Sequence, residues 1–337
     1  MLGDESRFRD CPGGWIENRS QLNNRKWSPV TMAALQVARQ AVTDAGWSQA
    51  DLKESALVVG TSRGNAAGWL GPWPARRPFK LMAASNTMHG ESASAISVEL
   101  GIAGPNHVIS TGCAAGLDAV GVAMMLLQLG KAERALVVAV DLPLVEVLLN
   151  QYADAGLLSR RLKANPYAPD TSGFIPAEGA AAMAIEVGDG RGPSLLAFES
   201  NSDACDPLGI PSHGGSTSDL FDQIKREFSE PTAVCPHATG TAVQAKADPA
   251  ILTNALSSRP SLHLLKPYLG HAIGASGLLE SAVMAEFLRV GQLPPNLPDL
   301  HAPAGFELPD KVTQAEGPVA KISHGMGGHN ALLLMDI

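Results

Sequence analysis

The sequence is poor in the features that mark several large classes of protein. Charged residues make up 17% of the 337 residues and hydrophobic ones 45%, which excludes a disordered chain or a long solvated coiled coil. Four cysteines in a chain of this length do not form a disulfide scaffold. Acidic residues (33) outnumber basic ones (25), so nucleic acid is not expected as a partner.

Long hydrophobic runs are also absent. No apolar stretch approaches the ~20 residues that span a bilayer, so we expect no membrane association. The first ten residues, MLGDESRFRD, are charged from Asp4 onward and lack the apolar segment of a signal peptide. The sequence therefore predicts a globular, enzyme-like protein of the cytoplasm, with one large domain or two fused ones.

The order of the predicted elements indicates an α/β fold. Ser28 to Gly46 reads as a helix, because Ser28 can cap its start and Gly46 can end it in a left-handed conformation. Helices are also expected after Gly112 and from Gly274 to Val290. Buried strands are expected at 56–60, 107–111, 135–140, 179–186, 231–237, 319–323 and 331–335. Two Gly/Pro-rich stretches, 60–78 and 291–305, read as long loops. Alternating strands and helices are typical of a layered α/β protein.

Cys113 lies in the segment STGCAAG, between a predicted strand and a predicted helix. Its small neighbours permit a sharp turn and close approach of a substrate. A thiol at a helix N-terminus faces unpaired N–H groups and the positive end of the dipole, so we expect a lowered pKa and a nucleophilic thiolate. The alternative is a buried structural cysteine.

His237 directly follows a predicted strand, and His271 directly precedes a predicted helix. Each histidine alone could be a capping or core residue. Together with Cys113 they could converge at one end of a sheet, where α/β proteins keep their sites. The same side chains, with Cys235, could instead bind zinc, although no close ligand pair of the C-x-x-C or H-x-x-x-H kind is present.

Glu280 falls on the apolar stripe of the last predicted helix, so it needs a partner if it is buried. Lys266 is the partner we expect, and the alternative is a surface charge on a half-exposed helix. The glycine-rich turn from Ser323 to Asn330 could present backbone N–H groups to an oxyanion.

These segments, in this order, resemble the elongating β-ketoacyl–acyl-carrier-protein synthases, condensing enzymes of the thiolase fold. The resemblance runs from about Ser28 to Ile337. It is carried by the segments STGCAAG, HATGT, KPYLGHAIGASGLLE, SHGMGGHN and YAPDTSGFIPAEGAAAMAIE. It implies a layered α-β-α-β-α fold of two similar halves, residues 28–187 with the nucleophile and residues 188–337 with the histidines, after an atypical segment 1–27.

The resemblance also implies a mechanism. Cys113 would accept an acyl group as a thioester, and His237 and His271 would stabilise the enolate formed when malonyl thioester loses carbon dioxide. The backbone N–H groups of Cys113 and Met326 would hold the oxyanion. Lys266 and Glu280 would set the charge around His271, and Thr239 and Thr241 would bind the phosphopantetheine arm. No metal and no tightly bound cofactor are implied.

The partners implied are acyl carrier protein or coenzyme A thioesters, and a second subunit, identical or related, in a dimer. Basic residues that could meet an acidic carrier protein are Arg76, Arg77, Lys80, Arg160, Arg161 and Lys163. Two other classes of function remain open. One is a non-catalytic, chain-length-determining partner of a synthase, and the other is an acyltransferase of the same fold.

The chain departs from the family pattern at several places. The opening strand of the family and the helix after it have no counterpart in the polar segment Met1 to Lys26. His324 and Met326 stand where the family usually has phenylalanine, and Met326 occupies the position of the gate to the acyl pocket. Ala238 replaces a glycine of the first histidine motif. Acyl-chain selection is therefore expected to differ.

Overall fold

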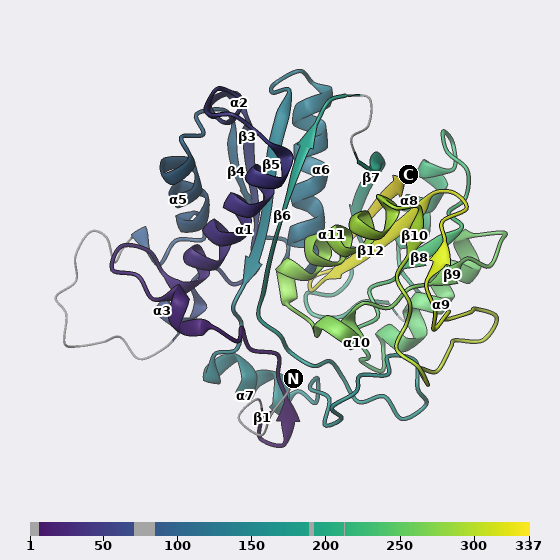
Figure 1. Cartoon of the computed structure of the whole chain (residues 1–337). Coiled ribbons are helices and arrows are strands. Elements are labelled where there is room, and N and C mark those ends of the chain that lie inside the picture. The colour runs from purple at the N-terminus through teal and green to yellow at the C-terminus, as the bar shows by residue number, and fades with distance from the viewer. Residues whose placement is uncertain (1–6, 71–84, 189–191, 212) are drawn as a thin grey trace.

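The computed structural model describes residues 7–70, 85–188, 192–211 and 213–337. Its centre is a pair of β-sheets with helices between them and on both outer faces (Figure 1). The expected loop 60–78 falls partly outside the described residues, and its described part holds the short helix α3 (Ala66–Trp69). None of the described helices is both long enough and apolar enough to cross a membrane.

The first sheet has four strands in the order β4-β3-β5-β6. They are β3 (Ala56–Gly60), β4 (Asn106–Ile109), β5 (Arg134–Asp141) and β6 (Gly179–Glu186). β3 runs parallel to both β4 and β5, whereas β6 is antiparallel to β5. β3 and β5 are consecutive apolar runs because helices cover both of their faces.

The second sheet has five strands in the order β7-β13-β12-β8-β9. They are β7 (Ser194–Ser202), β8 (Ala233–Cys235), β9 (Ser261–Leu262), β12 (Val319–Gly325) and β13 (His329–Asp336). β8 is parallel to β9 and β12, and the other pairings are antiparallel.

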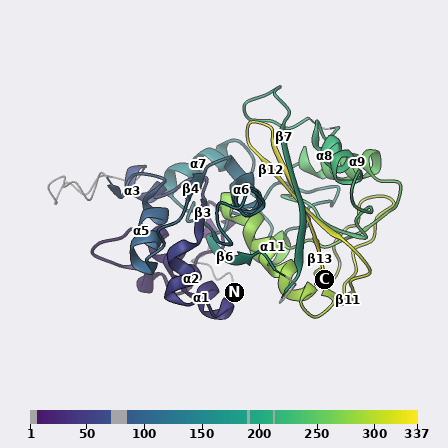
Figure 2. The same ribbon diagram turned by 90° about the horizontal axis from the view of Figure 1, so that it is seen from above.

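Alternate residues of each sheet pack against different helical layers. In β5, Leu136 packs with the outer helices, whereas Val137 packs with the central ones. The outer helices of the first sheet are α1 (Pro29–Ala45), α2 (Gln49–Glu54) and α5 (Glu91–Leu100). The central pair is α6 (Ala115–Gln128) and α11 (Ser276–Leu288), and the far face of the second sheet carries α8 (Thr217–Ile224) and α9 (Gln244–Ala255). Figures 1 and 2 show this order of layers, helix-sheet-helix-sheet-helix, from two directions, and the predicted thiolase-like architecture is confirmed.

The local signals for the first long helix are confirmed. The Ser28 side chain accepts a hydrogen bond from the Thr31 N–H at the start of α1, and Gly46 ends the helix with a φ of +67°. The remaining elements are short. They are β1 (Arg7–Phe8), β2 (Cys11–Pro12), η2 (Arg19–Leu22), η3 (Gly112–Ala114), α7 (Glu146–Asp154), α10 (Lys266–Leu269), η4 (Ile273–Ala275), β10 (Gln292–Leu293) and β11 (Thr313–Gln314).

The two sheets correspond strand for strand except at one edge. The four strands of the first sheet, in the order β6-β5-β3-β4, have the same relative directions as the strands β13-β12-β8-β9 of the second sheet. Within the described residues, β7 has no counterpart in the first sheet. The segment before α1 instead lies beside the chain that leads into β6, where the Gly14 N–H donates to the Pro176 carbonyl and the Gly14 carbonyl accepts from the Glu178 N–H (both 2.8 Å). Within the described residues, the segment before α1 supplies no strand to the first sheet.

The central helices cross in close contact at their N-termini. A Cβ atom built on Gly116 would lie 2.6 Å from the Gly274 carbonyl oxygen, and one on Gly277 would lie 2.9 Å from the Leu117 nitrogen. Only glycine fits at such distances, because the neighbouring atoms belong to the backbone and cannot rotate away. This contact brings η3, which carries Cys113, against η4, which follows His271.

Replacing Gly116 with Ala should lower the free energy of unfolding by about 1–3 kcal/mol, because the added methyl group pushes the two helices apart. Chemical denaturation followed by circular dichroism measures the change. Gly90→Ala is the matched control, since Gly90 has a φ of −74° and open space around its Cβ position. Equal stability of the two variants would contradict the role of the close helix contact.

Candidate active site

Cys113 lies in η3, the turn that joins β4 to α6. The C-terminal glycine turn packs directly on this turn: a Cβ on Gly112 would lie 3.3 Å from the Met326 nitrogen, and one on Gly325 would lie 2.4 Å from the Thr111 carbonyl oxygen. The Met326 N–H donates toward the Cys113 sulfur. The two backbone groups expected to form an oxyanion hole, from Cys113 and Met326, therefore belong to adjoining segments.

The expected lowering of the Cys113 pKa is wrong for this structure. Burial raises the pKa of the thiol to about 11, and the charges of Arg63 and Lys266 only partly oppose that effect. Cys113 also precedes α6 by a 3-10 turn, so it does not lie in the first turn of the helix where the dipole acts most strongly. The Cys113 side chain is consequently a protonated thiol near pH 7.

His237 follows β8 and His271 lies between α10 and η4, as the sequence indicated. Their ring centroids are 5.5 Å apart with an interplanar angle of 89°. Burial lowers the pKa of both imidazoles well below 6.5, and the positive charge of Lys266 lowers it further. Both rings are therefore neutral near pH 7, the form in which an imidazole N–H can donate to a carbonyl oxygen without itself being an ion.

Cys113 and the histidines are joined through an aromatic side chain. Cys113 packs against a buried cluster that contains Cys11, Tyr152, Leu158, Phe174 and Ile273. The Phe174 ring contacts His271 edge-on, with centroids 5.1 Å apart. The His271 Nδ1 lies 3.0 Å from the Ser276 Oγ, whereas the His237 Nδ1 is buried and has no hydrogen-bond partner among the described residues.

His324 forms a third imidazole of the site. Its ring centroid lies 5.4 Å from that of His237, so His324 lies beside the pair of histidines. The Gln244 amide donates to its Nδ1 (2.9 Å), so the proton is on Nε2 and points to the Thr217 hydroxyl (3.1 Å). Burial lowers the pKa of His324 to about 4, and the ring is held neutral.

Glu280 is buried, not on a half-exposed surface, and its predicted partner is confirmed. The Lys266 Nζ donates to its Oε1 at 2.6 Å, and the Lys321 Nζ donates to its Oε2 at 2.7 Å. Lys321 also donates to the Pro236 and Ile322 carbonyls, so it fixes the residue before His237. Lys321 was missed in the sequence, where its signal is a single basic residue in the apolar strand VAKIS.

The other expected residues lie around the same centre. Thr239 is buried and its hydroxyl is 3.4 Å from that of Thr241, while Met326 is 39% exposed. The Cys235 thiol points to the Glu280 carboxylate at 3.7 Å. No cluster of three or more potential metal ligands occurs among the residues that are described.

Asp141, at the end of β5, is a further buried group, and no motif in the sequence marks it. Its carboxylate accepts hydrogen bonds from the Thr61 hydroxyl and from the backbone N–H groups of Ser62, Arg63 and Gly274, at 2.8–2.9 Å. Burial raises the pKa of Asp141 to about 6 despite these donors. The carboxylate ties the loop after β3 to η4, beside His271.

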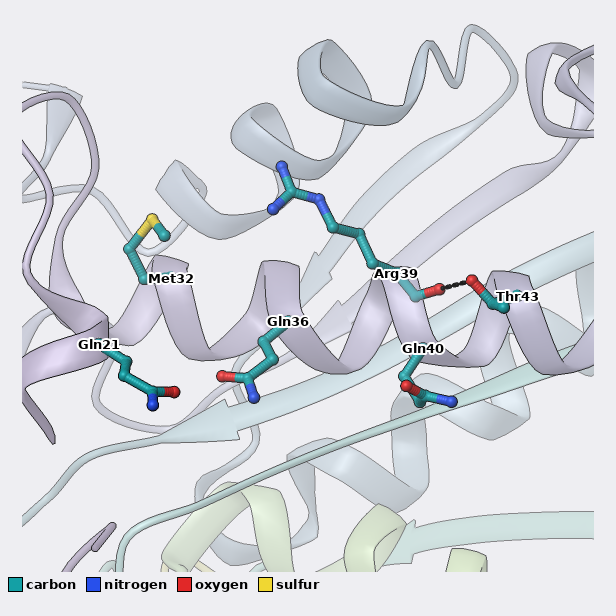
Figure 3. A pocket seen from close by; sticks show the side chains of 6 residues that line it. All are labelled: Gln21, Met32, Gln36, Arg39, Gln40 and Thr43. Carbon is teal, nitrogen blue, oxygen red and sulfur yellow. Dashed lines mark hydrogen bonds between the residues drawn. The ribbon is translucent and has the colours of Figure 1, made fainter. Parts of the chain in front are cut away.

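Two hollows lie outside this centre. One of about 370 Å³ borders the cluster on which Cys113 packs and is lined by Arg9, Cys11, Ala153, Gly156, Leu158, Arg160 and Ser172. The other, of about 310 Å³, follows the outer face of α1 and is lined by Gln21, Met32, Gln36, Arg39, Gln40 and Thr43 (Figure 3). Its lining contains no residue predicted for the site.

The sequence matches the models of two domains, β-ketoacyl synthase N-terminal domain over residues 11–188 and β-ketoacyl synthase C-terminal domain over residues 212–298. The chain belongs to the β-ketoacyl synthase family. It is 27% identical to 3-oxoacyl-[acyl-carrier-protein] synthase 2 of Rhizobium meliloti, in an alignment that covers 99% of this chain and 86% of the relative.

Solved ketosynthases share the fold. A ketosynthase in the complex AntDE:AntF, a type II system solved with its acyl-carrier protein, has a TM-score of 0.86 at 22% identity, covering 100% of this chain and 91% of that one. The ishigamide ketosynthase/chain length factor has a TM-score of 0.82 at 22% identity, covering 92% and 82%. The predicted family and fold are thereby confirmed.

Replacing Glu280 with Gln should lower the free energy of unfolding at pH 7 by about 3–5 kcal/mol, because two buried ammonium groups lose their anion. Burial by itself would raise the pKa of Glu280, but Lys266 and Lys321 outweigh it and hold the pKa below 4.5. The stabilisation is thus full above pH 4.5 and is lost as the pH falls through the lower folded-state value.

Denaturant unfolding of wild type and Glu280→Gln between pH 3 and 8 measures the difference between their free energies of unfolding. This difference should become smaller toward pH 3. Glu286→Gln on the same helix is the control, since Glu286 is exposed and pairs only with Arg289 among the described residues. A pH-independent difference would contradict the charge argument.

Alkylation of Cys113 by iodoacetamide should accelerate about tenfold per pH unit between pH 7 and 9, because a thiol with a pKa of about 11 gains thiolate across that whole range. Intact mass spectrometry follows the reaction in a Cys205→Ser background, which removes the exposed thiol. The same background with Cys113→Ala gives the contribution of the buried cysteines. A rate that is constant above pH 7 would show a lowered pKa instead.

Proposed function

We propose that this chain catalyses the decarboxylative Claisen condensation of an acyl thioester with malonyl carrier protein, in fatty-acid or polyketide-type synthesis. The observation that carries the proposal is the pair of buried neutral imidazoles, His237 and His271, with centroids 5.5 Å apart, joined through Phe174 to the cluster on which Cys113 packs. Membership of the β-ketoacyl synthase family supports it.

In the first step the Cys113 sulfur attacks the thioester carbonyl of the acyl donor. The Cys113–acyl bond forms, the bond to the carrier sulfur breaks, and the proton of the Cys113 thiol leaves with the carrier thiol. The N–H groups of Cys113 and Met326 stabilise the oxyanion of the tetrahedral intermediate. Thr239 and Thr241 bind the phosphopantetheine arm that delivers each thioester.

In the second step malonyl thioester replaces the freed carrier. His237 and His271 donate hydrogen bonds to its thioester carbonyl, and the carbon–carbon bond to the carboxylate breaks to give carbon dioxide and an enolate. The enolate carbon attacks the acyl-Cys113 carbonyl, and collapse of the second tetrahedral intermediate expels the Cys113 thiolate, which takes up a proton. Lys266 and Glu280 keep His271 in place and fix the local charge.

A second candidate is a non-catalytic, chain-length-determining subunit, because one structural neighbour is a ketosynthase/chain length factor. The presence of Cys113, His237 and His271 in one site favours the catalytic alternative. An acyltransferase that passes the Cys113 acyl group to a non-carbon acceptor would not need paired imidazoles for an enolate.

The proposed partners are an acyl carrier protein or coenzyme A thioesters, and a second subunit of the same or a related chain. Of the basic residues considered for carrier binding, Arg76, Arg77 and Lys80 lie outside the described residues. Arg161 pairs with Asp170 and Lys163 with the Pro298 carbonyl, whereas Arg160 lines the 370 Å³ cavity. Arg160 is thus the one of the three described that we retain for an acidic carrier.

Replacing His237 or His271 with Ala should leave acyl transfer to Cys113 in place but reduce carbon dioxide release from malonyl carrier protein by about 100-fold or more, since each loses a donor to the enolate. Intact mass after mixing with acyl thioesters measures the first step, and release of labelled carbon dioxide measures the second. Cys113→Ala should show no acyl-enzyme. Undiminished decarboxylation in both histidine variants would overturn the proposal.

A further inference from the structure

Arg63 is held at the site by its backbone. It lies three residues after the end of β3, and its N–H donates to the Asp141 Oδ1 at 2.8 Å. The other oxygen of Asp141 accepts from the Gly274 N–H in η4, next to His271. The position of Arg63 is therefore fixed by the same buried carboxylate that fixes the His271 turn.

The Arg63 side chain is incompletely satisfied. Its Nη2 donates to the Tyr152 hydroxyl at 3.1 Å, but its Nε is buried and has no hydrogen-bond partner in the part of the chain that the structure describes. No acidic side chain in the described ranges forms an ion pair with the guanidinium, and the nearby Asp141 oxygens accept from the Thr61 hydroxyl and from backbone donors. A buried donor without an acceptor is costly, so its retention needs an explanation.

Arg63 also lies close to the nucleophile. Its charge acts directly on both the Cys113 sulfur and the Tyr152 hydroxyl. Tyr152 and Cys113 share the cluster around Phe174, where the Tyr152 and Phe174 ring centroids are 5.6 Å apart. A guanidinium and a phenol thus stand beside the atom that is to carry the acyl group, next to the apolar cluster around Phe174.

An apolar acyl chain is a poor fit for this arrangement. An alkyl group against Arg63 would exclude water from the guanidinium and leave the Nε donor unpaired. An oxygen of the acyl group could accept from it instead. Sites that are built to hydrogen-bond a polar group reject the analogue that lacks the group, because their own buried donors then remain unsatisfied.

We propose that Arg63, aided by Tyr152, selects acyl groups that carry an oxygen acceptor close to the thioester, either a β-keto oxygen or a carboxylate, over plain alkyl groups. This inference rests on the proposed function, because it assigns the substrate class of the same Cys113 site. Arg63 binds the acyl oxygen directly, and Tyr152 orients the guanidinium.

The test compares acylation of Cys113 by butyryl, acetoacetyl and succinyl carrier-protein thioesters, followed by intact mass. The quantity compared is the acylation rate with an oxygenated thioester divided by the rate with the butyryl thioester. For one of the two oxygenated thioesters this ratio should be at least about tenfold higher in wild type than in Arg63→Met, the loss expected for one charge-assisted hydrogen bond. A higher ratio with the acetoacetyl thioester identifies a β-keto oxygen as the acceptor, and a higher ratio with the succinyl thioester identifies a carboxylate. A ratio is used because Arg63 also lowers the Cys113 pKa, which alters all three rates equally.

Arg63→Lys should keep part of the preference for the oxygenated thioester, and Tyr152→Phe should weaken that preference. These two variants also test the inference if Arg63→Met folds poorly. Arg39→Met on the outer face of α1 is the matched control and should leave the ratios unchanged. Acylation with the same ratios in wild type and the Arg63 variants would overturn this inference alone. No acylation by any thioester would overturn the proposed function and this inference with it.

Discussion

The buried ion triad of Lys266, Glu280 and Lys321 is the constraint on which the site depends. One carboxylate on α11 binds the ammonium group at the start of α10 and a second one on β12, so three elements meet at a single side chain. Lys321 extends the network to the carbonyl next to His237. Such a triad gains little net stability over apolar packing, but removal of one member leaves buried charge unpaired. The triad therefore holds the segments that carry His237 and His271 in fixed positions relative to each other.

The same charges set the electrostatics of the chemistry. Two cations near the imidazoles disfavour a third positive charge, so burial and Lys266 keep His237 and His271 neutral. In the proposed condensation, a neutral donor suits a developing enolate, since it stabilises negative charge without first neutralising the malonyl carboxylate that must depart. The pKa of Cys113 shifts in the opposite direction, because burial outweighs the nearby cations and keeps the thiol protonated near pH 7. The charged groups are thus those of the triad, whereas Cys113, His237 and His271 are neutral.

Much of the fold could be predicted from local patterns, because β3, β5 and β6 are short apolar runs and α1 carries cap residues at both ends. The serine-rich helix α5 and the proline-containing helix α9 have no such signal and form through tertiary packing, and the strand β7 follows its apolar first half with a polar second half. The site residues with motifs were found at their expected places, whereas Lys321, Asp141 and Arg63 were not, since their partners are far away in sequence. The Cys113 pKa was predicted with the wrong sign because desolvation is a property of the folded surroundings.

The glycine contact between α6 and α11 has a consequence for how this scaffold can diversify. Since backbone touches backbone there, the turns bearing the sulfur and the second imidazole form one rigid block that tolerates almost no remodelling. In the proposed reaction, the choice of acyl group is then left to side chains at the margins of this block, such as Arg63, His324 and the partly exposed Met326 beside two left-handed glycines. Point substitutions at these margins can therefore change which acyl group the proposed site accepts while the backbone that positions Cys113 and His271 stays the same.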